Sequence, residues 1–145
     1  MKVRIKKLTD RAIIPTYGSV GSAGGDLYSA EEKDVLIAPN QTVLIGTGLA
    51  VEIPDGYVGL VYARSGLATK SGLAPANKVG VIDSDYRGEI KVALHNHSGE
   101  TRTVAKGDRI AQMVIAPYLK VEYDEVEDLT DTTRGAGGFG STGKN

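Results

Sequence analysis

Hydrophobic and polar residues alternate over short stretches of this chain, and glycine, proline, asparagine or aspartate separates one stretch from the next. The stretches are rich in valine and isoleucine, which favour extended strands. In chain order they cover residues 3–8, 34–39, 41–53, 57–63, 89–96, 108–118 and 119–126. Only "SGLATKSG" (65–72) suits a short helix, of about two turns. Many short strands at near-regular spacing predict an all-β sandwich or barrel with one short helix.

The last residues of the chain differ from the rest in composition. "TDTTRGAGGFGSTGKN" (130–145) has few apolar residues to bury and many glycines, which is typical of a mobile arm. The preceding residues are numerous enough for one domain with its own core. The sequence therefore predicts a β-sandwich domain over 1–129 and a flexible C-terminal arm over 130–145.

Composition and charge narrow the possible partners. The formal net charge is -1, so no basic field points to nucleic acid. The absence of cysteine excludes disulfides, thiolate metal sites and a cysteine nucleophile. No apolar run approaches the about 18 residues of a membrane span, and the charged start "MKVRIKKLTD" lacks the apolar core of a signal peptide. These features predict a soluble cytoplasmic protein with neither a nucleic-acid nor a membrane partner.

The arm has the composition of a phosphate-binding segment. Residues 138–144 satisfy most of the pattern G-x-x-x-x-G-K, although Asn145 stands where that pattern has Ser or Thr. The guanidinium of Arg134 could pair with phosphate and the ring of Phe139 could stack on a base. A flexible solubilising tail is the alternative interpretation of the same residues.

The middle of the chain, "YARSGLATKSGLAPANKVGVIDSDYRGEIKVAL" (62–94), carries the other candidate chemistry. Asp83 follows strand-like residues, and Tyr86 and Gly88 form a turn before the next strand. We expect a β-hairpin here, whose open backbone edge can read a flat base through N–H and C=O groups. A single aspartate at a strand end could instead only cap the turn.

Five segments together resemble one family over essentially the whole chain. In order they are "AGGDLYSA" (23–30), "ARSGLATKSG" (63–72), "NKVGVIDSDYRGEIKV" (77–92), "KGDRIAQMVI" (106–115) and "RGAGGFGSTG" (134–143). Their order and spacing resemble the five motifs of the trimeric all-β dUTPases (deoxyuridine 5'-triphosphate nucleotidohydrolases). Ala63 departs from the proline that many members have before Arg-Ser-Gly.

The resemblance implies a jelly-roll-like β-sandwich that assembles into a homotrimer. Each of the three active sites would be built from three subunits, and the C-terminal arm would close over the nucleotide of a neighbouring subunit. The activity implied is hydrolysis of dUTP to dUMP and pyrophosphate, which keeps uracil out of DNA and supplies dUMP for thymidylate synthesis.

The resemblance also assigns roles to single residues. Asp83 matches the catalytic aspartate that activates water for attack on the α-phosphate. Tyr86 matches the ring that packs under deoxyribose and leaves no room for a 2′-hydroxyl. Mg²⁺ is implied as the cofactor, held mostly by substrate phosphates and water. Asp26 resembles the first-motif carboxylate, which would support either the water shell of the metal or Arg64.

The remaining substrate contacts fall into three groups. Uracil would be read by Asn77 and by the backbone of Val81, Ile82 and Lys91. The phosphates would meet Arg64, Ser65, Gly66 and Gln112. From the arm, the contacts would be Arg134 on the γ-phosphate, Phe139 on uracil, and Gly140, Ser141 and Thr142 in the closing loop.

Two alternatives share this fold. A dCTP deaminase places a glutamate on the strand after the predicted hairpin, and the matching residue is Ala93, which leaves no general base for deamination. A regulatory nucleotide-binding protein would be expected to lose Asp83 or the arm, and both are present. Turnover of dUTP, compared with release of ammonia from dCTP, separates the three possibilities.

Overall fold

The computed structural model describes residues 1–138. Within them lie eleven strands and one helix, α1 (Ser65–Ser71). The strands are β1 (Arg4–Lys7), β2 (Gly25–Tyr28), β3 (Val35–Ile37), β4 (Thr42–Gly46), β5 (Leu49–Glu52), β6 (Tyr57–Tyr62), β7 (Leu73–Pro75), β8 (Val79–Ile82), β9 (Lys91–Asn96), β10 (Arg102–Val104) and β11 (Arg109–Pro117). The predicted short helix over 65–72 is confirmed. This helix is too short to span a membrane, and it is the only one within residues 1–138.

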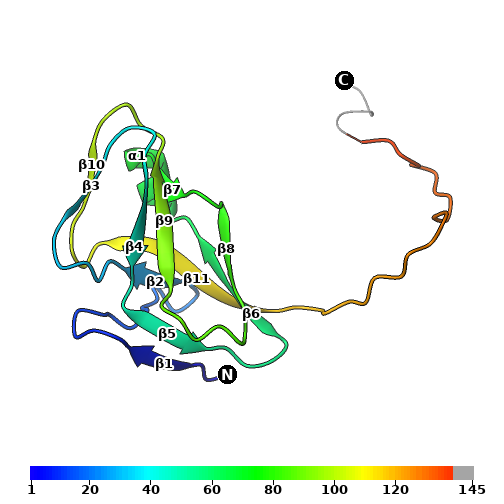
Figure 1. Ribbon diagram of the computed structural model, residues 1–145, viewed down its shortest axis with the longest axis horizontal. Coiled ribbons are helices and arrows are strands. Elements are labelled where there is room, and N and C mark those ends of the chain that lie inside the picture. The colour runs from blue at the N-terminus through cyan, green and yellow to red at the C-terminus, as the bar shows by residue number, and fades with distance from the viewer. Residues whose placement is uncertain (139–145) are drawn as a thin grey trace.

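The strands pair antiparallel in four small sheets around one apolar core (Figure 1). The largest sheet has the order β2-β11-β6-β8, and the second has the order β4-β9-β7. Strand β1 pairs with β5, and β3 pairs with β10. Side chains from both larger sheets meet in the core, among them Leu27, Val61, Val92, Leu94 and Met113. The all-β sandwich predicted from the alternation is confirmed.

Strand β9 shows how the alternation places side chains in the core. Val92, Leu94 and Asn96 point inward and are at most 2% exposed. The buried amide of Asn96 donates to the carbonyl oxygens of Ile37 (2.8 Å) and Glu100 (2.7 Å). A buried amide with its hydrogen bonds made avoids the desolvation penalty of an unpaired polar group. Asn96 therefore fixes the end of β9 against the neighbouring β3 segment.

One glycine divides the apolar run at 41–53 into two strands. The chain bends at Thr47 and Gly48, so that β4 and β5 enter different sheets. Gly48 has φ +64°, a conformation that strains residues with a side chain. A Cβ atom there would also lie 3.0 Å from Cβ of Ala12. Both the backbone and the packing at this bend therefore require glycine.

The predicted β-hairpin between residues 79 and 96 is wrong. Strand β8 pairs with β6, whereas β9 pairs with β4 on one side and β7 on the other. A strand has only two edges, and both edges of β9 are occupied. The chain turns between β8 and β9 without pairing them, so β8 remains at the edge of the largest sheet.

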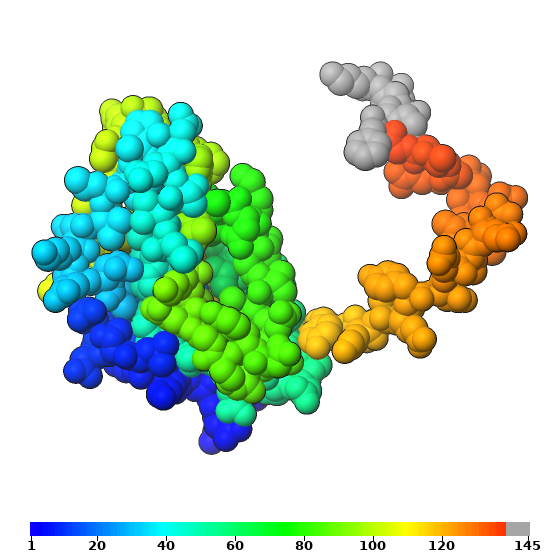
Figure 2. Space-filling model, in the orientation of Figure 1, coloured from blue at the N-terminus to red at the C-terminus, as the bar shows by residue number. Residues whose placement is uncertain are grey.

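The strand predicted over 119–126 is also wrong for the single chain. Strand β11 ends at Pro117, and residues 118–138 contain neither helix nor strand. The first of them still border the sandwich, where the N–H of Tyr118 donates to the carbonyl oxygen of Gly56 (3.0 Å). The later ones lead away from the sandwich (Figure 1) and stand clear of its surface (Figure 2). Leu119 and Tyr123 are 91% and 92% exposed. An extended segment becomes a strand only beside another strand, and the described part of this chain brings none to it.

Candidate active site

The free edge of strand β8 is the first component of the site. Its four residues pair with β6 on one side, from Val79 opposite Tyr62 to Ile82 opposite Gly59. The other side has no strand beside it among residues 1–138. Val81, in the middle of this strand, is 60% exposed. An open strand edge presents backbone N–H and C=O groups that can bind a flat polar ligand.

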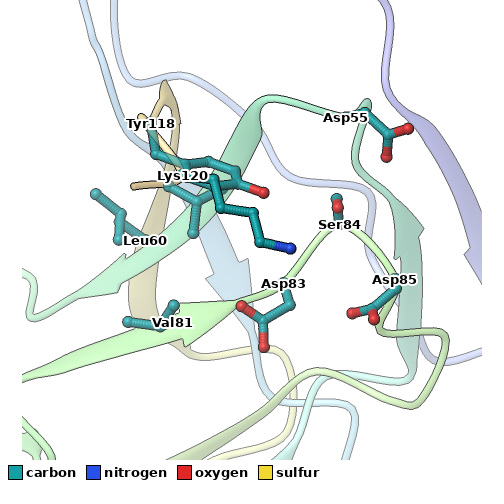
Figure 3. Close-up of a pocket in the computed structure, with 9 residues that line it drawn as sticks. Asp55, Leu60, Val81, Asp83, Ser84, Asp85, Tyr118 and Lys120 are labelled. Carbon is teal, nitrogen blue, oxygen red and sulfur yellow. The ribbon is translucent and has the colours of Figure 1, made fainter. Parts of the chain in front are cut away.

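Asp83 follows β8 directly and is exposed. Its carbonyl oxygen accepts a hydrogen bond from the N–H of Tyr86 (3.2 Å), which closes the turn. The residue borders two hollows, one lined also by Asp55 and Asp85 and one lined also by Tyr86. In the first hollow, the side chain of Lys120 points toward Asp83 (Figure 3). The turn therefore holds the Asp83 carboxylate where a water molecule and a ligand can both reach it.

Tyr86 lies over Gly88 at the end of this turn. The phenol oxygen donates a hydrogen bond to the carbonyl oxygen of Glu89 (2.9 Å). A Cβ atom on Gly88 would lie 2.6 Å from Cζ and 2.9 Å from Cε2 of Tyr86. The ring is thus fixed by a hydrogen bond at its tip and by contact along its edge, while 43% of the residue stays exposed.

Asn77 lies in the turn that leads into β8. Lys78, the next residue, has φ +64°, which reverses the chain. Nδ2 of Asn77 lies 3.4 Å from the position that a Cβ atom on Gly80 would take, so its amide lies alongside β8. We call the residues around this edge the β8 cluster: Asn77, Val81, Ile82, Asp83, Tyr86 and Lys91.

A second group of polar residues surrounds Asp26 in strand β2. Although Asp26 is buried, Oδ1 accepts a hydrogen bond from Nε of Arg64 (2.8 Å) and Oδ2 accepts one from Nη1 of Arg109 (3.3 Å). Two guanidinium groups thus neutralise one carboxylate and leave net positive charge facing the hollow beside them. Of the two roles predicted for Asp26, its contacts favour support of Arg64.

Gln112 and the start of helix α1 complete this second group. Nε2 of Gln112 donates to the carbonyl oxygen of Ala63 (2.9 Å). A Cβ atom on Gly24 would lie 3.1 Å from Cδ of Gln112, so the glycine leaves space for the amide. Ser65 and Gly66 are exposed in the first turn of α1, where backbone N–H groups have no acceptor within the helix. We call these residues the α1 cluster: Asp26, Arg64, Ser65, Gly66, Arg109 and Gln112.

Arg109 is the member of the α1 cluster that was not predicted from the sequence. It lies at the start of β11, three positions before Gln112, and borders the same hollow as Arg64. The sequence feature that could have identified it is a positively charged residue inside the fourth motif, at the start of an otherwise mostly apolar strand.

The two clusters do not meet in one chain. They line separate hollows that share no residue. In the largest sheet, β2 with Asp26 and β8 beside Asp83 occupy opposite edges. Three strand spacings across a sheet amount to about 14 Å. The α1 cluster carries the cationic groups that suit phosphate, whereas the β8 cluster carries the edge and ring that suit a base and a sugar.

The residues predicted in the arm are placed only in part. Arg134 is exposed, and its Nε donates to the carbonyl oxygen of Gly137 (2.8 Å), away from both clusters. The other predicted contacts lie outside the described residues, and they are Phe139, Gly140, Ser141 and Thr142.

Two histidines at the end of β9 lie outside the β8 and α1 clusters. The ring centroids of His95 and His97 are 4.3 Å apart, and Nδ1 of His95 shares a hydrogen bond with Oγ1 of Thr42 (2.8 Å). Desolvation lowers the pKa of His97, and the charges of His95 and Lys78 act in the same direction. Within residues 1–138, no group of three or more His, Cys, Asp or Glu side chains is arranged to hold a metal ion.

Comparison with known proteins gives one consistent family. The sequence model of the dUTPase family matches residues 10–143. The deoxyuridine 5'-triphosphate nucleotidohydrolase of Nautilia profundicola is 58% identical over 144 residues, which are 99% of this chain and 100% of that protein. The Staphylococcus bacteriophage 80alpha dUTPase with dUPNHPP superposes with a TM-score of 0.86 at 32% identity, over 99% of each chain. A mutant dUTPase from phage phi11 of S. aureus, described with a structural Mg(II) ion, superposes with a TM-score of 0.79 at 28% identity, over 88% of this chain and 98% of that chain.

Proposed function

The chain belongs to the dUTPase family, and we propose that it hydrolyses dUTP to dUMP and pyrophosphate in the cytoplasm by attack of water on the α-phosphate. The observation that carries the proposal is that the two clusters offer different groups to a nucleotide. One offers a strand edge with Asp83 and Tyr86, and the other offers two guanidinium groups oriented by Asp26. This activity would keep uracil out of DNA and supply dUMP for thymidylate synthesis.

Asp83 acts as the general base in this proposal. Its exposed carboxylate stands at the end of the strand that reads the base, so a water molecule bound there faces the phosphate end of the same nucleotide. Transfer of the water proton to the carboxylate generates the hydroxide character that attack on phosphorus needs. The proton stays on Asp83, the water oxygen forms a bond to the α-phosphorus, and the bond from the α-phosphorus to the bridging oxygen breaks to release pyrophosphate.

Recognition of the base and sugar is assigned to the β8 cluster. The open edge at Val81 and Ile82, the amide of Asn77 and the backbone of Lys91 read uracil. A cytosine base would leave buried donors facing donors, which is a stronger form of discrimination than a steric contact. The ring of Tyr86, held over Gly88, packs under deoxyribose and leaves no space for a 2′-hydroxyl.

The α1 cluster binds the phosphates. Asp26 holds Arg64 with its guanidinium toward the hollow, and Ser65, Gly66 and Gln112 border that hollow from the helix start and from β11. The residues fit a nucleotide that brings its own Mg²⁺, because the Asp26 carboxylate is already engaged by two guanidinium groups. When bound, Mg²⁺ supplies positive charge to the phosphate oxygens, mostly through substrate and water ligands.

Because the clusters lie apart on one chain, the complete site requires more than one subunit. We assign a homotrimer, in which the β8 cluster of one subunit faces the α1 cluster of another. The exposed apolar side chains of residues 118–129 support this assembly, since a second subunit would bury them. Beyond them, Arg134 would reach the γ-phosphate at a neighbouring site, and Phe139 would stack on its uracil, closed over by Gly140, Ser141 and Thr142.

Release of pyrophosphate from a panel of dUTP, dCTP, dTTP and UTP tests the proposal. We expect rapid release from dUTP and little from the other three, together with no ammonia from dCTP. Ammonia release would show a deaminase, and tight dUTP binding without turnover would show a regulatory nucleotide-binding protein. Either result would contradict the proposed hydrolysis.

A further inference from the structure

Glu89 connects the Tyr86 ring to a distant turn of the sandwich. Its carbonyl oxygen accepts the hydrogen bond from the Tyr86 phenol (2.9 Å). Its carboxylate Oε1 accepts a hydrogen bond from the N–H of Gly48 (2.8 Å), at the buried bend between β4 and β5. One residue therefore holds the tip of the ring with its backbone and holds the bend with its side chain.

The residue after Glu89 binds the same bend. The N–H of Ile90 donates to the carbonyl oxygen of Leu49 (2.8 Å), and the carbonyl oxygen of Ile90 accepts from N (3.2 Å) and Oγ1 (2.7 Å) of Thr47. The segment carrying Asp83 and Tyr86 thus leaves one sheet at β8 and is next hydrogen-bonded to the sandwich at residues 89 and 90. Between these points, Nη2 of Arg87 lies 3.9 Å from Oε1 of Glu52 in an exposed ion pair. The position of Tyr86 within it depends on this second anchor.

Two charged side chains, Lys91 and Glu31, lie near the Glu89 carboxylate. Nζ of Lys91 lies 3.5 Å from Oε2 of Glu89. Glu31 is the other carboxylate at the bend, where its Oε1 accepts a hydrogen bond from the N–H of Gly46 (2.8 Å). A Cβ atom on Gly46 would lie 2.7 Å from Oε1 of Glu89 and 3.3 Å from Oε1 of Glu31. Glu31 and Glu89 therefore bracket one bend, but Glu89 alone also contacts Tyr86.

We infer that Glu89 is a positioning residue for sugar selection, acting through Tyr86. The inference rests on the proposed function, because it concerns the ring that would exclude the 2′-hydroxyl. The Gly48 hydrogen bond fixes the Glu89 side chain and, through it, the direction of the Glu89 carbonyl. That carbonyl fixes the phenol, and the phenol holds the ring against Gly88. Without these contacts the Tyr86 ring can move, which leaves space for the 2′-hydroxyl of a ribonucleotide.

The ratio of kcat/KM for dUTP to kcat/KM for UTP is the quantity that tests this inference. We expect Glu89→Ala to lower the ratio about tenfold, the effect of losing one well-made hydrogen bond at a buried N–H group. Glu89→Gln keeps an acceptor oxygen for Gly48 and should keep most of the ratio. The matched control is Glu31→Ala, which removes an equivalent hydrogen bond at the same bend and should cost similar thermal stability without changing the ratio.

A double-mutant cycle separates positioning from general loosening. Tyr86→Phe removes only the phenol hydrogen bond, so it should lower the ratio, and adding Glu89→Ala to it should lower the ratio little further. The Tyr86→Phe variant also keeps the test decisive if Glu89→Ala does not fold. An unchanged ratio in Tyr86→Phe or Glu89→Ala, or an equal loss in Glu31→Ala, would overturn the inference. A wild-type chain that fails to hydrolyse dUTP would instead overturn the proposed function, and the inference with it.

Discussion

The carboxylate of Asp26 accepts a 2.8 Å hydrogen bond from Nε of Arg64, although Asp26 lies on β2 and Arg64 follows β6, which is not adjacent to β2 in the sheet. Arg109 approaches the other carboxylate oxygen at 3.3 Å. A buried carboxylate is tolerated because two guanidinium groups pair with it. In return, the carboxylate holds two cations close together that would otherwise repel each other.

Removing the charge of Asp26 should weaken nucleotide binding. In Asp26→Asn the side chain keeps its shape, but Arg64 loses its charged partner and swings away from the phosphates. We expect kcat/KM for dUTP to fall by about tenfold or more, mainly through KM, as charge-assisted contacts are lost. The control is Glu100→Gln, which removes a surface ion pair with Arg102 and should leave kinetics unchanged. If the two variants have equal kcat/KM for dUTP, Asp26 has no role in phosphate binding.

Asp83 and Asp85 are neighbouring carboxylates with different expected roles. Asp83→Asn keeps the shape of the turn and removes the base, so turnover should fall ~10²-fold or more while dUTP binding persists. Asp85→Asn removes the same charge from the same exposed turn and should retain near-full turnover. Steady-state kinetics and nucleotide titration measure both quantities. Near-full turnover by Asp83→Asn would mean that its carboxylate only caps the turn.

The contact of Tyr86 with Gly88 predicts the effect of one methyl group. In Gly88→Ala the new Cβ would stand 2.6 Å from Cζ of Tyr86, so the ring must move. We expect the loss of discrimination against UTP to exceed the loss of dUTP turnover. The same result is expected for Tyr86→Ala, which removes the ring. Gly99→Ala is the matched control, because a Cβ atom there meets nothing within 4 Å. Equal losses on dUTP and UTP would mean that the ring only supports the turn.

Local patterns predicted most of the fold. Alternation in "EIKVALHN" identifies β9, and the polar-rich "SGLATKSG" identifies α1. Strands β2 (GDLY), β7 (LAP) and β10 (RTV) were not predicted, because they lack the run of apolar residues that marks the equally short β3 (VLI). Pairing could not be read from local pattern either. The neighbours in sequence, β8 and β9, enter different sheets because β4 and β7 take the two edges of β9.

The site was predicted from the family resemblance rather than from the residues alone. The resemblance grouped Asp83 with Tyr86 and Arg64 with Gln112, and the structure brings each pair to a common hollow. The sequence left two roles open for Asp26, and the choice needed its buried contacts with Arg64. Arg109 was missed because its side chain becomes relevant only when β11 lies beside β2.

The residues after Asp131 should be needed for catalysis and not for folding. The last strand ends at Pro117, and residues 131–136 are exposed. Truncation after Asp131 should therefore leave Tm and the mass of the assembly nearly unchanged. Turnover of dUTP should fall about 100-fold, because phosphate contacts and water exclusion are lost. A large drop in Tm would instead assign the arm a structural role.

Complementation between two inactive chains tests the shared active site most directly. Asp83→Asn chains carry an intact arm, and chains truncated after Asp131 carry an intact Asp83. We predict that unfolding the two together and refolding them restores dUTP hydrolysis, whereas either chain treated alone stays inactive. Random assembly of an equal mixture should unite Asp83 with a neighbour's arm at about a quarter of the sites. If the mixture stays inactive while mass measurements show mixed trimers, the site lies within one chain, which would contradict the shared active site.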